Sequence, residues 1–534
     1  MGNVNRIKPM RPIIRTALPI GTLLLLVVAA YAKATGFEFT HWDDGYYVVD
    51  NPVIRSLSPP SLYAAFSRFF MGNYAPLQIV SYAADYRVWG LNPFGFHLSN
   101  MVLHALNAVA LFFLVKNITG RSLSGWIAAA LFAVHPLNVE AVAWVAQRKT
   151  LLAQFFFLLA FLEYLDWTNG KKRGRYILSS ALFAASLLSK VSTITLPLLL
   201  VLYDVCYRDR SVRCAIADKI PFFFLSGLFA ALALIAQSSA YHGVFAYHGG
   251  SLLGNAFTTI VAVARYVVNI FYPVHLSAYY YFSYSSMFSY PVLGSLLLLF
   301  FVGVLLYRGR KNKPVLFWAG WFFIALIPNL QLIPLDAVMA DRYLYLPAIG
   351  AYVLMGSAWE GLRHAWSDSP FAHRSIVICG AGILVLFGLV SFQRLNVWQD
   401  DYALWSATAR EDPSPMAYNN LAAYWGSAGE LEKAKEALEA ALRIEPNDFM
   451  ATKNMGKLLA MKRDFPGAVA YLARAARISP RDEDLSITLA SVYADQGKIE
   501  EAGKILESFV KQNPDWKEAR EKLLALKRGA FIPK

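Results

Sequence analysis

Cysteine is scarce in this chain of 534 residues. Only Cys206, Cys214 and Cys379 occur, and no two of them form a C-x-x-C pair. A disulfide framework or a cysteine-based zinc site needs more cysteines at closer spacing. Neither kind of site is therefore supported by the sequence.

Charge is also scarce. Asp, Glu, Lys and Arg make up 16% of the chain, against about 25% in an average soluble protein, while hydrophobic residues reach 57%. The apolar excess is confined to residues 13–392, where runs close to the length needed to cross about 30 Å of hydrocarbon recur. From about Trp398 onward the chain is charged and rich in alanine. The sequence predicts a membrane domain at 1–397 and a soluble domain at 398–534.

The net charge of +14 is carried largely by short loops. Basic residues gather at 6–15, 171–175, 208–213 and 308–313. Such clusters orient membrane spans, because loops rich in Lys and Arg stay on the cytoplasmic side. No groove-reading motif accompanies the charge, so nucleic acid is not a predicted partner.

Eleven spans are predicted, with a cytoplasmic N-terminus and an external C-terminus. The first apolar run, Ile13–Tyr31, lacks a convincing A-x-A cleavage site, which favours a retained helix over a cleaved signal peptide. The segment Asn255–Pro273 is predicted to lie at the outer interface, because a span there would move the 308–313 cluster outside. The predicted spans are 12–32, 96–116, 122–138, 150–166, 176–189, 194–207, 220–237, 291–307, 314–330, 343–358 and 375–392.

Prolines recur every 34 residues in the soluble domain, at Pro446, Pro480 and Pro514. This is the period of the tetratricopeptide repeat, in which a proline follows the second of two helices that pack through small residues. The predicted units are 415–448, 449–482 and 483–516, followed by a final helix near 516–526. The fold class is thus all-α, a polytopic helical bundle followed by an α-solenoid.

Two uses of the repeat stack stay open at this point. It can be a plain scaffold, or its concave face can hold an extended polypeptide. In the second case Tyr418, Trp425 and Tyr493 are the predicted contacts for an acceptor polypeptide.

An acidic pair follows the first span. The chain reads His41-Trp42-Asp43-Asp44-Gly45 within an outer loop predicted at 33–95. Adjacent carboxylates beside a membrane helix are costly to desolvate, which favours a metal, a cationic partner or proton transfer. A carboxylate base is what a hydroxyl needs when it attacks the anomeric carbon of a sugar. The alternative is an ordinary turn, because Asp-Gly is a common turn pair.

Four cations stand at the outer ends of predicted spans, at Arg148, Lys149, Lys190 and Arg342. This placement runs against the orientation bias, so these residues are predicted to bind an anion such as a polyprenyl phosphate. For Arg148 and Lys149 the alternative is snorkelling to the lipid headgroups. The residues predicted to support the cations are His97, His135, Glu140 and Asp341.

His97 and His104 lie two helical turns apart, with Asn100 and Asn107 on the same face. A metal-binding pair usually stands one turn apart, so a polar seam between helices is favoured. No further His or Cys completes a ligand set. No metal site and no cofactor are predicted.

Together these stretches resemble a known group of enzymes. Trp42-Asp43-Asp44-Gly45-Tyr46 and Gly95-Phe96-His97-Leu98-Ser99-Asn100 resemble the start of GT-C fold glycosyltransferases. The whole set is similar to the transmembrane-and-tetratricopeptide-repeat-containing protein O-mannosyltransferases and their bacterial relatives. The closer matches are His135-Pro136 through Arg148, Ser186-Leu187-Leu188-Ser189-Lys190, Leu202-Tyr203-Asp204 and Asp341-Arg342-Tyr343-Leu344-Tyr345-Leu346-Pro347.

The resemblance implies transfer of a sugar, with inversion, from a polyprenyl-phosphate donor to Ser or Thr hydroxyls of exported proteins. It implies Asp43 as the base with Asp44 as its partner, and Arg148, Lys190 and Arg342 facing the lipid phosphate. The chain departs from the family where Val191 follows Lys190 and where Lys149-Thr150-Leu151-Leu152 follows Arg148, because an acid is missing from each motif.

Two other functions stay open. An enzyme of the same fold could modify a lipid or a surface glycan, with the repeats recruiting a partner. A non-catalytic membrane anchor for a repeat scaffold is the third hypothesis. The family likeness favours a bacterial inner membrane, with the repeat domain in the periplasm.

Overall fold

The computed structural model describes residues 12–241, 246–284, 286–480, 482–513 and 516–528. The chain forms two compact units, Met1–Asp400 and Asp401–Lys534, here called the membrane unit and the repeat unit. Their junction lies three residues from the boundary expected at residue 398. In the described ranges the regular elements are helices, apart from one isolated bridge between Phe70 and Asn73.

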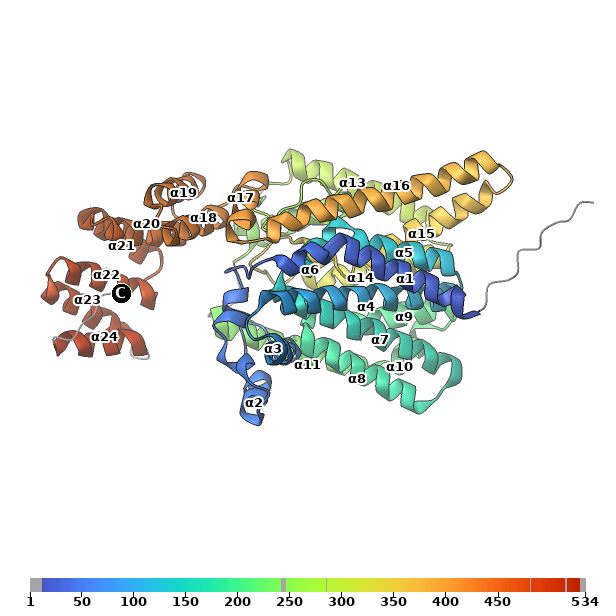
Figure 1. Cartoon of the computed structure of the whole chain (residues 1–534), viewed down its shortest axis with the longest axis horizontal. Coiled ribbons are helices and arrows are strands. Elements are labelled where there is room, and N and C mark those ends of the chain that lie inside the picture. Colours follow the sequence, from blue (N-terminus) through green and yellow to red (C-terminus); the bar gives the residue numbers. More distant parts are fainter. Residues whose placement is uncertain (1–11, 242–245, 285, 481, 514–515, 529–534) are drawn as a thin grey trace, which may run out of the picture. The chain divides into compact units, whose positions relative to one another are not determined.

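Long helices run side by side through the membrane unit (Figure 1). Each of the eleven predicted spans falls on one of them: α1 (Pro12–Tyr31), α4 (Pro93–Thr119), α5 (Ser122–Val134), α7 (Arg148–Gly170), α8 (Arg173–Ser189), α9 (Leu196–Tyr207), α11 (Ile220–Tyr241), α13 (Tyr290–Gly309), α14 (Lys313–Leu326), α15 (Ala348–Ala365) and α16 (Pro370–Arg394). Among the described residues seven helices are long and apolar enough to cross a membrane. The unit is thus a multi-pass membrane domain, and the count of eleven stays a prediction.

The segment expected at the interface forms most of α12 (Leu252–Phe271), one of those seven helices. Near its start, Asn255 donates to the carbonyl of Gln331 at 2.9 Å. Near its end, the Tyr266 hydroxyl accepts from the backbone N–H of Ala340 at 3.1 Å. Both ends therefore contact one loop, residues 327–341, which favours a helix that lies along this end of the bundle.

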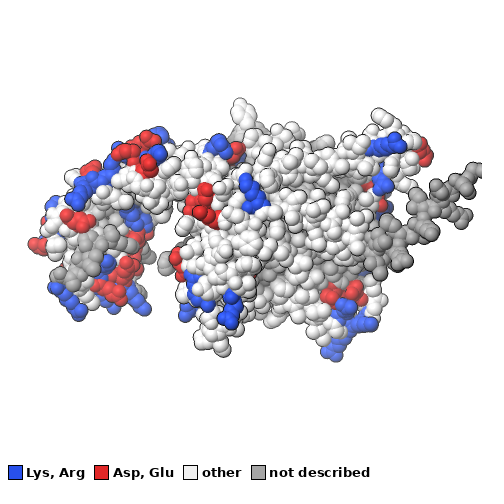
Figure 2. Space-filling view, viewed as in Figure 1, with Lys and Arg blue, Asp and Glu red and all other residues white. Residues whose placement is uncertain are grey.

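Charged side chains gather towards the two ends of the membrane unit and leave a band between them almost free of charge (Figure 2). Such a band is what a hydrocarbon layer requires. The cluster 171–175 spans the turn from α7 into the start of α8, and the cluster 308–313 spans the turn from the end of α13 to the start of α14. The side chains of the first cluster, residues 6–15, lie outside the described residues.

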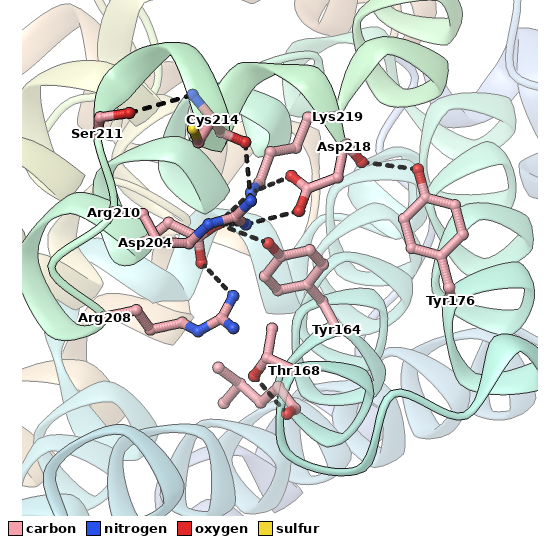
Figure 3. A network of polar contacts seen from close by, with 11 residues as sticks. Tyr164, Thr168, Tyr176, Asp204, Arg208, Arg210, Ser211, Cys214, Asp218 and Lys219 are labelled. Carbon is pink, nitrogen blue, oxygen red and sulfur yellow. Dashed lines mark hydrogen bonds and ion pairs between the residues drawn. The ribbon is translucent and has the colours of Figure 1, made fainter.

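A buried ionic network joins helices at the end that carries the basic clusters (Figure 3). Asp204 on α9 is fully buried, and its carboxylate contacts Lys219 and accepts from Arg210 at 2.8 Å and from the Tyr164 hydroxyl at 3.0 Å. Asp218 on the other side contacts Lys219 at 2.7 Å and Arg210 at 2.6 Å. Because each buried charge is paired, the network ties α7, α9, α10 (Val212–Ala217) and the start of α11 together without an isolated ion.

The chain between α5 and α7 is not one continuous helix. It passes through the 3₁₀ turns η4 (Pro136–Asn138) and η5 (Val145–Gln147) and the short α6 (Val139–Ala143), with a bend of 55° after α5. This interrupted segment, residues 135–147, leaves backbone carbonyls without helical partners. Inside a membrane domain such groups need other donors.

Polar side chains of α4 supply donors to this segment and to the helices on either side of it. Asn100, His104 and Asn107 are fully buried and bond to main-chain oxygens at 3.0–3.2 Å. The acceptors are the carbonyls of Val142 and Trp144 in the interrupted segment, of Ala133 at the end of α5 and of Leu151 in α7. The polar seam predicted from the spacing on α4 is thus confirmed, with backbone rather than side chains as its main partner.

The repeat unit is a series of antiparallel helix pairs, from orange to red in Figure 1. After α17 (Asp401–Glu411) come α18 (Pro415–Ser427) with α19 (Leu431–Ile444), α20 (Phe449–Met461) with α21 (Phe465–Ile478), α22 (Glu483–Asp495) with α23 (Ile499–Gln512), and α24 (Lys517–Lys527). Each pair falls inside one predicted unit. Pro446 and Pro480 follow the second helix of their pairs, and Pro514 lies outside the described residues.

Small residues set the spacing within each pair. Ala434, Ala468 and Ala502 stand 34 residues apart and are 0–1% exposed. A Cβ at Gly456 would come 2.6 Å from Cγ of Leu472 on the partner helix, closer than real Cβ contacts allow. Glycine and alanine at these positions therefore permit the close approach that the repeat requires.

Candidate active site

Asp44 is a buried carboxylate held by three hydrogen bonds. One oxygen accepts from the backbone N–H and the hydroxyl of Thr40, both at 3.1 Å, and the other accepts from the N–H of Ala146 at 2.7 Å. Ala146 lies in η5, so this side chain fastens the first loop to the interrupted segment. Burial raises the pKa of Asp44 to about 7, against the opposing effect of these hydrogen bonds.

Asp43 differs from Asp44 in its burial and in its hydrogen bonds. It is half-buried, and its carboxylate has no hydrogen-bond or ion-pair partner within the described part of the chain. The positive charges of Lys149 and Arg342 are close enough to interact with it electrostatically. Of the predicted acidic pair, Asp43 is therefore the member whose carboxylate is available for chemistry.

Arg342 lies over a stack of tryptophan rings. Trp42 stacks on Trp144 with centroids 4.5 Å apart, and Trp144 stacks on Trp398 at 5.4 Å. The Arg342 guanidinium carbon is 5.9 Å from the Trp42 ring centre and 5.3 Å from that of Trp144. Its guanidinium pairs with the buried Glu140, which also accepts from the Arg342 backbone N–H at 2.9 Å. Arg342 is thereby fixed next to Trp42, the residue before Asp43.

Lys149 and Lys190 are neighbouring lysines with little to neutralise them. Lys190 donates to the Thr150 hydroxyl at 2.9 Å, and the Lys149 ammonium lies 4.9 Å from the Tyr47 ring centre. Within the described residues no carboxylate lies in ion-pair distance of either ammonium. Both line a cavity of about 30 Å³, and Lys190 shares a second cavity of about 20 Å³ with Arg342. Lys149, Lys190 and Arg342 therefore form a cationic cluster that suits an anion.

Arg148 has other partners. Its guanidinium is buried, pairs with Asp85 on α3 (Pro76–Trp89) at 2.8 Å and donates to the Phe96 carbonyl at 2.7 Å and to Asn100. These contacts tie the start of α7 to α3 and α4. They favour a structural role, and the predicted phosphate contact of Arg148 stays a prediction.

The predicted supporting residues hold the surrounding loops. His135 Nε2 donates to the Ile270 carbonyl of α12 at 3.0 Å, and its other ring nitrogen accepts from the Leu137 N–H at 3.3 Å. Asp341 accepts from the Tyr280 hydroxyl at 2.7 Å, and burial raises the pKa of Asp341 to about 7. His97 reaches the carbonyl of Glu38 in the first loop at 3.4 Å. In the described ranges no group of three His, Cys, Asp or Glu side chains is arranged to bind a metal ion.

Sequence reasoning missed three of these partners. Thr40 caps Asp44, Asp85 neutralises Arg148, and Tyr280 binds Asp341. Asp85 stands out only as the one acidic residue in the stretch 76–89, which does not indicate its partner. The contacts of Thr40 and Tyr280 depend on tertiary structure.

The three predicted acceptor contacts lie within the repeat unit on α18 and α22. The Trp425 ring packs against Tyr402 of α17 at 5.3 Å, with the Lys433 ammonium 4.4 Å from its centre. Tyr493 packs against the core cluster of α22, α23 and α24, and Tyr418 is half-buried on α18. Trp425 and Tyr493 thus belong to different clusters, and acceptor binding by these residues stays a prediction.

The comparisons with known proteins agree with the resemblance. Residues 417–448 and 458–526 match the family description "Tetratricopeptide repeat". Protein O-mannosyl-transferase TMTC3 of Homo sapiens is 26% identical over 93% of this chain and 61% of its own length. Protein O-mannosyl-transferase TMTC1 of Mus musculus is 35% identical over a shorter stretch, 28% of this chain and 17% of its own. The chain thus spans about three fifths of the length of the first of these relatives.

Among solved structures, the oligosaccharyltransferase of Archaeoglobus fulgidus aligns over 79% of this chain and 59% of its own. The sequence identity is 11% and the TM-score 0.45. The sequence likeness to the O-mannosyl-transferases extends over nearly the whole chain, as the motifs predicted.

Proposed function

We propose that this chain is a membrane glycosyltransferase that transfers a sugar, in the first instance mannose, from a polyprenyl-phosphate donor to Ser or Thr hydroxyls of exported proteins. The observation that carries the proposal is the juxtaposition of Asp43, an available carboxylate, with the cationic cluster of Lys149, Lys190 and Arg342. A base and an anion site are the two parts that transfer from a lipid phosphate requires. The likeness to protein O-mannosyl-transferases supports the sugar and the acceptor class.

In this proposal Asp43 acts as the general base. The acceptor hydroxyl attacks the anomeric carbon from the face opposite the phosphate, and its proton passes to the Asp43 carboxylate. The bond between the anomeric carbon and the phosphate oxygen breaks as the new glycosidic bond forms. A single displacement of this kind inverts the configuration at the anomeric carbon.

The cationic cluster receives the leaving group. Lys149, Lys190 and Arg342 bind the donor phosphate and stabilise the charge that develops on its oxygen as the bond breaks. Arg342 is already paired with Glu140, whereas neither lysine has a carboxylate within ion-pair distance among the described residues. Asp44 does not touch the reacting atoms; its bonds to Thr40 and Ala146 position the loop that carries Asp43.

The repeat unit is proposed to hold the acceptor polypeptide, with Tyr418, Trp425 and Tyr493 among its contacts. The proposed location is a bacterial inner membrane, with the first loop on the outer face and the repeats in the periplasm. The two contacts of α12 with the loop 327–341 support this orientation, because an α12 that does not span would keep the 308–313 cluster on the cytoplasmic side.

The test is transfer by the full chain reconstituted in liposomes. Polyprenyl-phosphate mannose and a Ser- and Thr-rich acceptor protein are supplied, and mass spectrometry looks for a hexose on the acceptor. The matched reaction supplies a nucleotide sugar in place of the lipid donor. We expect labelled protein only with the lipid donor. Transfer to a lipid or a glycan in place of the protein overturns the acceptor class, and no transfer from any lipid donor overturns the enzyme assignment.

A further inference from the structure

An apolar groove lies at the end of the membrane unit that carries the basic clusters, away from the candidate active site. It is formed by the first half of α5, the second half of α15 and the first half of α16, which are neighbours in Figure 1. Its volume is about 230 Å³, and its walls include Trp126, Leu131, Met355, Trp359 and Leu384. From Met355 to Arg363 it follows two turns of α15, about 12 Å.

A cationic pocket continues the groove towards solvent. It measures about 530 Å³ and is lined by Arg121, Glu360, Arg363 and His373. Leu123 and Arg363 line both spaces, so the apolar groove and the polar mouth adjoin.

The two arginines at this mouth outnumber its one carboxylate, that of Glu360. Within the described residues neither Arg121 nor Arg363 has a carboxylate in ion-pair distance. Arg363 donates through Nε to the His373 ring at 2.9 Å, which leaves its terminal nitrogens free for another acceptor. The Glu360 carboxylate is occupied by the backbone N–H of Ser124 at 3.2 Å and by the Ser124 hydroxyl.

Close helix contacts shape the walls of the groove. A Cβ at Gly380 would come 2.3 Å from the Trp359 ring, so only glycine lets that ring lie against the backbone of α16. A Cβ at Gly356 would come 2.8 Å from the Ser124 carbonyl, which shows how closely α15 approaches α5. The groove is therefore bounded by a close contact between α15 and α16 and by a close contact between α15 and α5.

We propose that this groove binds one anionic phospholipid, with an acyl chain in the apolar part and the phosphate against Arg121 and Arg363. Guanidinium groups bind phosphate oxygens with charge-assisted hydrogen bonds, and an adjoining apolar channel suits a lipid better than a free anion. This site is separate from the cluster of Lys149, Lys190 and Arg342, which lies at the opposite end of the helices.

The bound lipid would bridge α5 and α15. At its other end α5 leads into the interrupted segment. The other end of α15 follows the stretch that carries Arg342. Holding the pair together at one end therefore also stabilises the elements that position the candidate active site at the other.

The test measures lipid preference on the purified full chain after delipidation. Micelles containing dioleoyl phosphatidylglycerol are compared with micelles containing dioleoyl phosphatidylcholine, by melting temperature and by native mass spectrometry. We expect about tenfold tighter binding of phosphatidylglycerol, a preference that the double variant Arg121→Gln/Arg363→Gln loses. The matched control Lys172→Gln/Arg173→Gln removes two exposed charges at the same end and should keep the preference.

A second variant tests the apolar part. Ala381→Phe places a ring in the groove and should abolish retention of phosphatidylglycerol, while Ile378→Phe, on the exposed side of the same helix, should not. Equal retention of both lipids by the wild type, or an unchanged preference in the arginine double variant, overturns the proposal. Equal stabilisation by glycerol phosphate without acyl chains overturns it as well, because a headgroup anion would then suffice.

Discussion

The carboxylate of Asp44 accepts a hydrogen bond at 2.7 Å from the backbone N–H of Ala146, a residue 102 positions further along the chain. This contact explains why two adjacent acids have different environments. The interrupted segment leaves an N–H without a helical partner, and Asp44 satisfies it from the first loop. Asp43 then stands half-exposed on the same turn, beside Lys149 and Arg342.

Replacing Asp43 by asparagine should abolish transfer while leaving the fold intact. A positioned general base contributes about 100- to 10,000-fold to a rate, and the half-buried Asp43 side chain has no hydrogen bond in the described structure to lose. The measurement is sugar transfer at saturating donor, with the melting temperature as a check on folding. Asp50→Asn in the same loop is the control and should keep wild-type activity. A fully active Asp43→Asn variant would remove Asp43 from the mechanism.

Replacing Asp44 by asparagine should lower the melting temperature, because the amide cannot reproduce three accepted hydrogen bonds. The gap to the wild type should also depend on pH. The pKa of Asp44 is raised to about 7 in the fold, so between about pH 4 and about pH 7 the folded carboxyl keeps a proton that the unfolded one has lost. Raising the pH through this window therefore destabilises the wild type alone, and the gap should narrow as pH rises. A gap that widens would show that the fold prefers the ionised carboxylate.

The ion pair between Glu140 and Arg342 should matter far more than a surface pair. Glu140→Gln leaves a buried guanidinium without its partner, which costs about 3–5 kcal/mol of unfolding free energy. The matched change is Glu163→Gln, which breaks the solvent-exposed pair with Arg175 and should leave the melting temperature nearly unchanged. Thermal unfolding of both variants in the same detergent decides the comparison. Similar losses in the two would mean that Arg342 finds another partner.

Removing one lysine of the cationic cluster should weaken donor binding. Lys149→Met or Lys190→Met is expected to raise KM for the polyprenyl-phosphate donor about tenfold, the value of one hydrogen bond to a charged group. The KM for the acceptor should change little. Lys172→Met, at an exposed position far from the cluster, serves as the control. An effect on the acceptor KM alone would place the phosphate elsewhere.

Two glycines of the repeat unit should respond in opposite directions to alanine. Gly456→Ala drives a Cβ into Leu472 and should cost about 1–3 kcal/mol. Gly426→Ala meets nothing within 4 Å and should gain about 1 kcal/mol from helix propensity. Hydrogen–deuterium exchange of peptides from α18 and α20 in the full chain measures both. Equal protection in the two variants would contradict the packing at Gly456.

Periodic features were accessible from the sequence. The 34-residue spacing of prolines predicted the helix pairs of the repeat unit, and the residues His104, Asn100 and Asn107 predicted a polar seam on α4. Both depend on local geometry, because a helix fixes which side chains share a face. Hydrophobic run lengths likewise predicted where the helices of the membrane unit lie.

The roles within the site were less accessible, because they depend on contacts between distant residues. Nothing near Arg148 in the sequence shows that Asp85 neutralises it, and nothing near Asp44 points to Ala146. Arg148 and Lys149 are adjacent in the sequence, yet Lys149 lines a cavity while Arg148 pairs with α3 and donates to α4. The predicted span ends placed four cations at one end of the bundle, and the structure shows that one of them, Arg148, has separate partners.

The polar seam of α4 also has a consequence for biogenesis. His104 bonds to the Tyr345 hydroxyl at 2.8 Å, across 241 residues of chain. During synthesis α4 leaves the ribosome long before α15, since chains emerge from the N-terminus. Until Tyr345 arrives, a polar imidazole lacks this partner in the nascent bundle. Insertion of the later helices therefore completes the seam. A chain that terminates before Tyr345 would leave the His104 ring nitrogen without this partner, and that unpaired polar group would be available for recognition by cellular quality control.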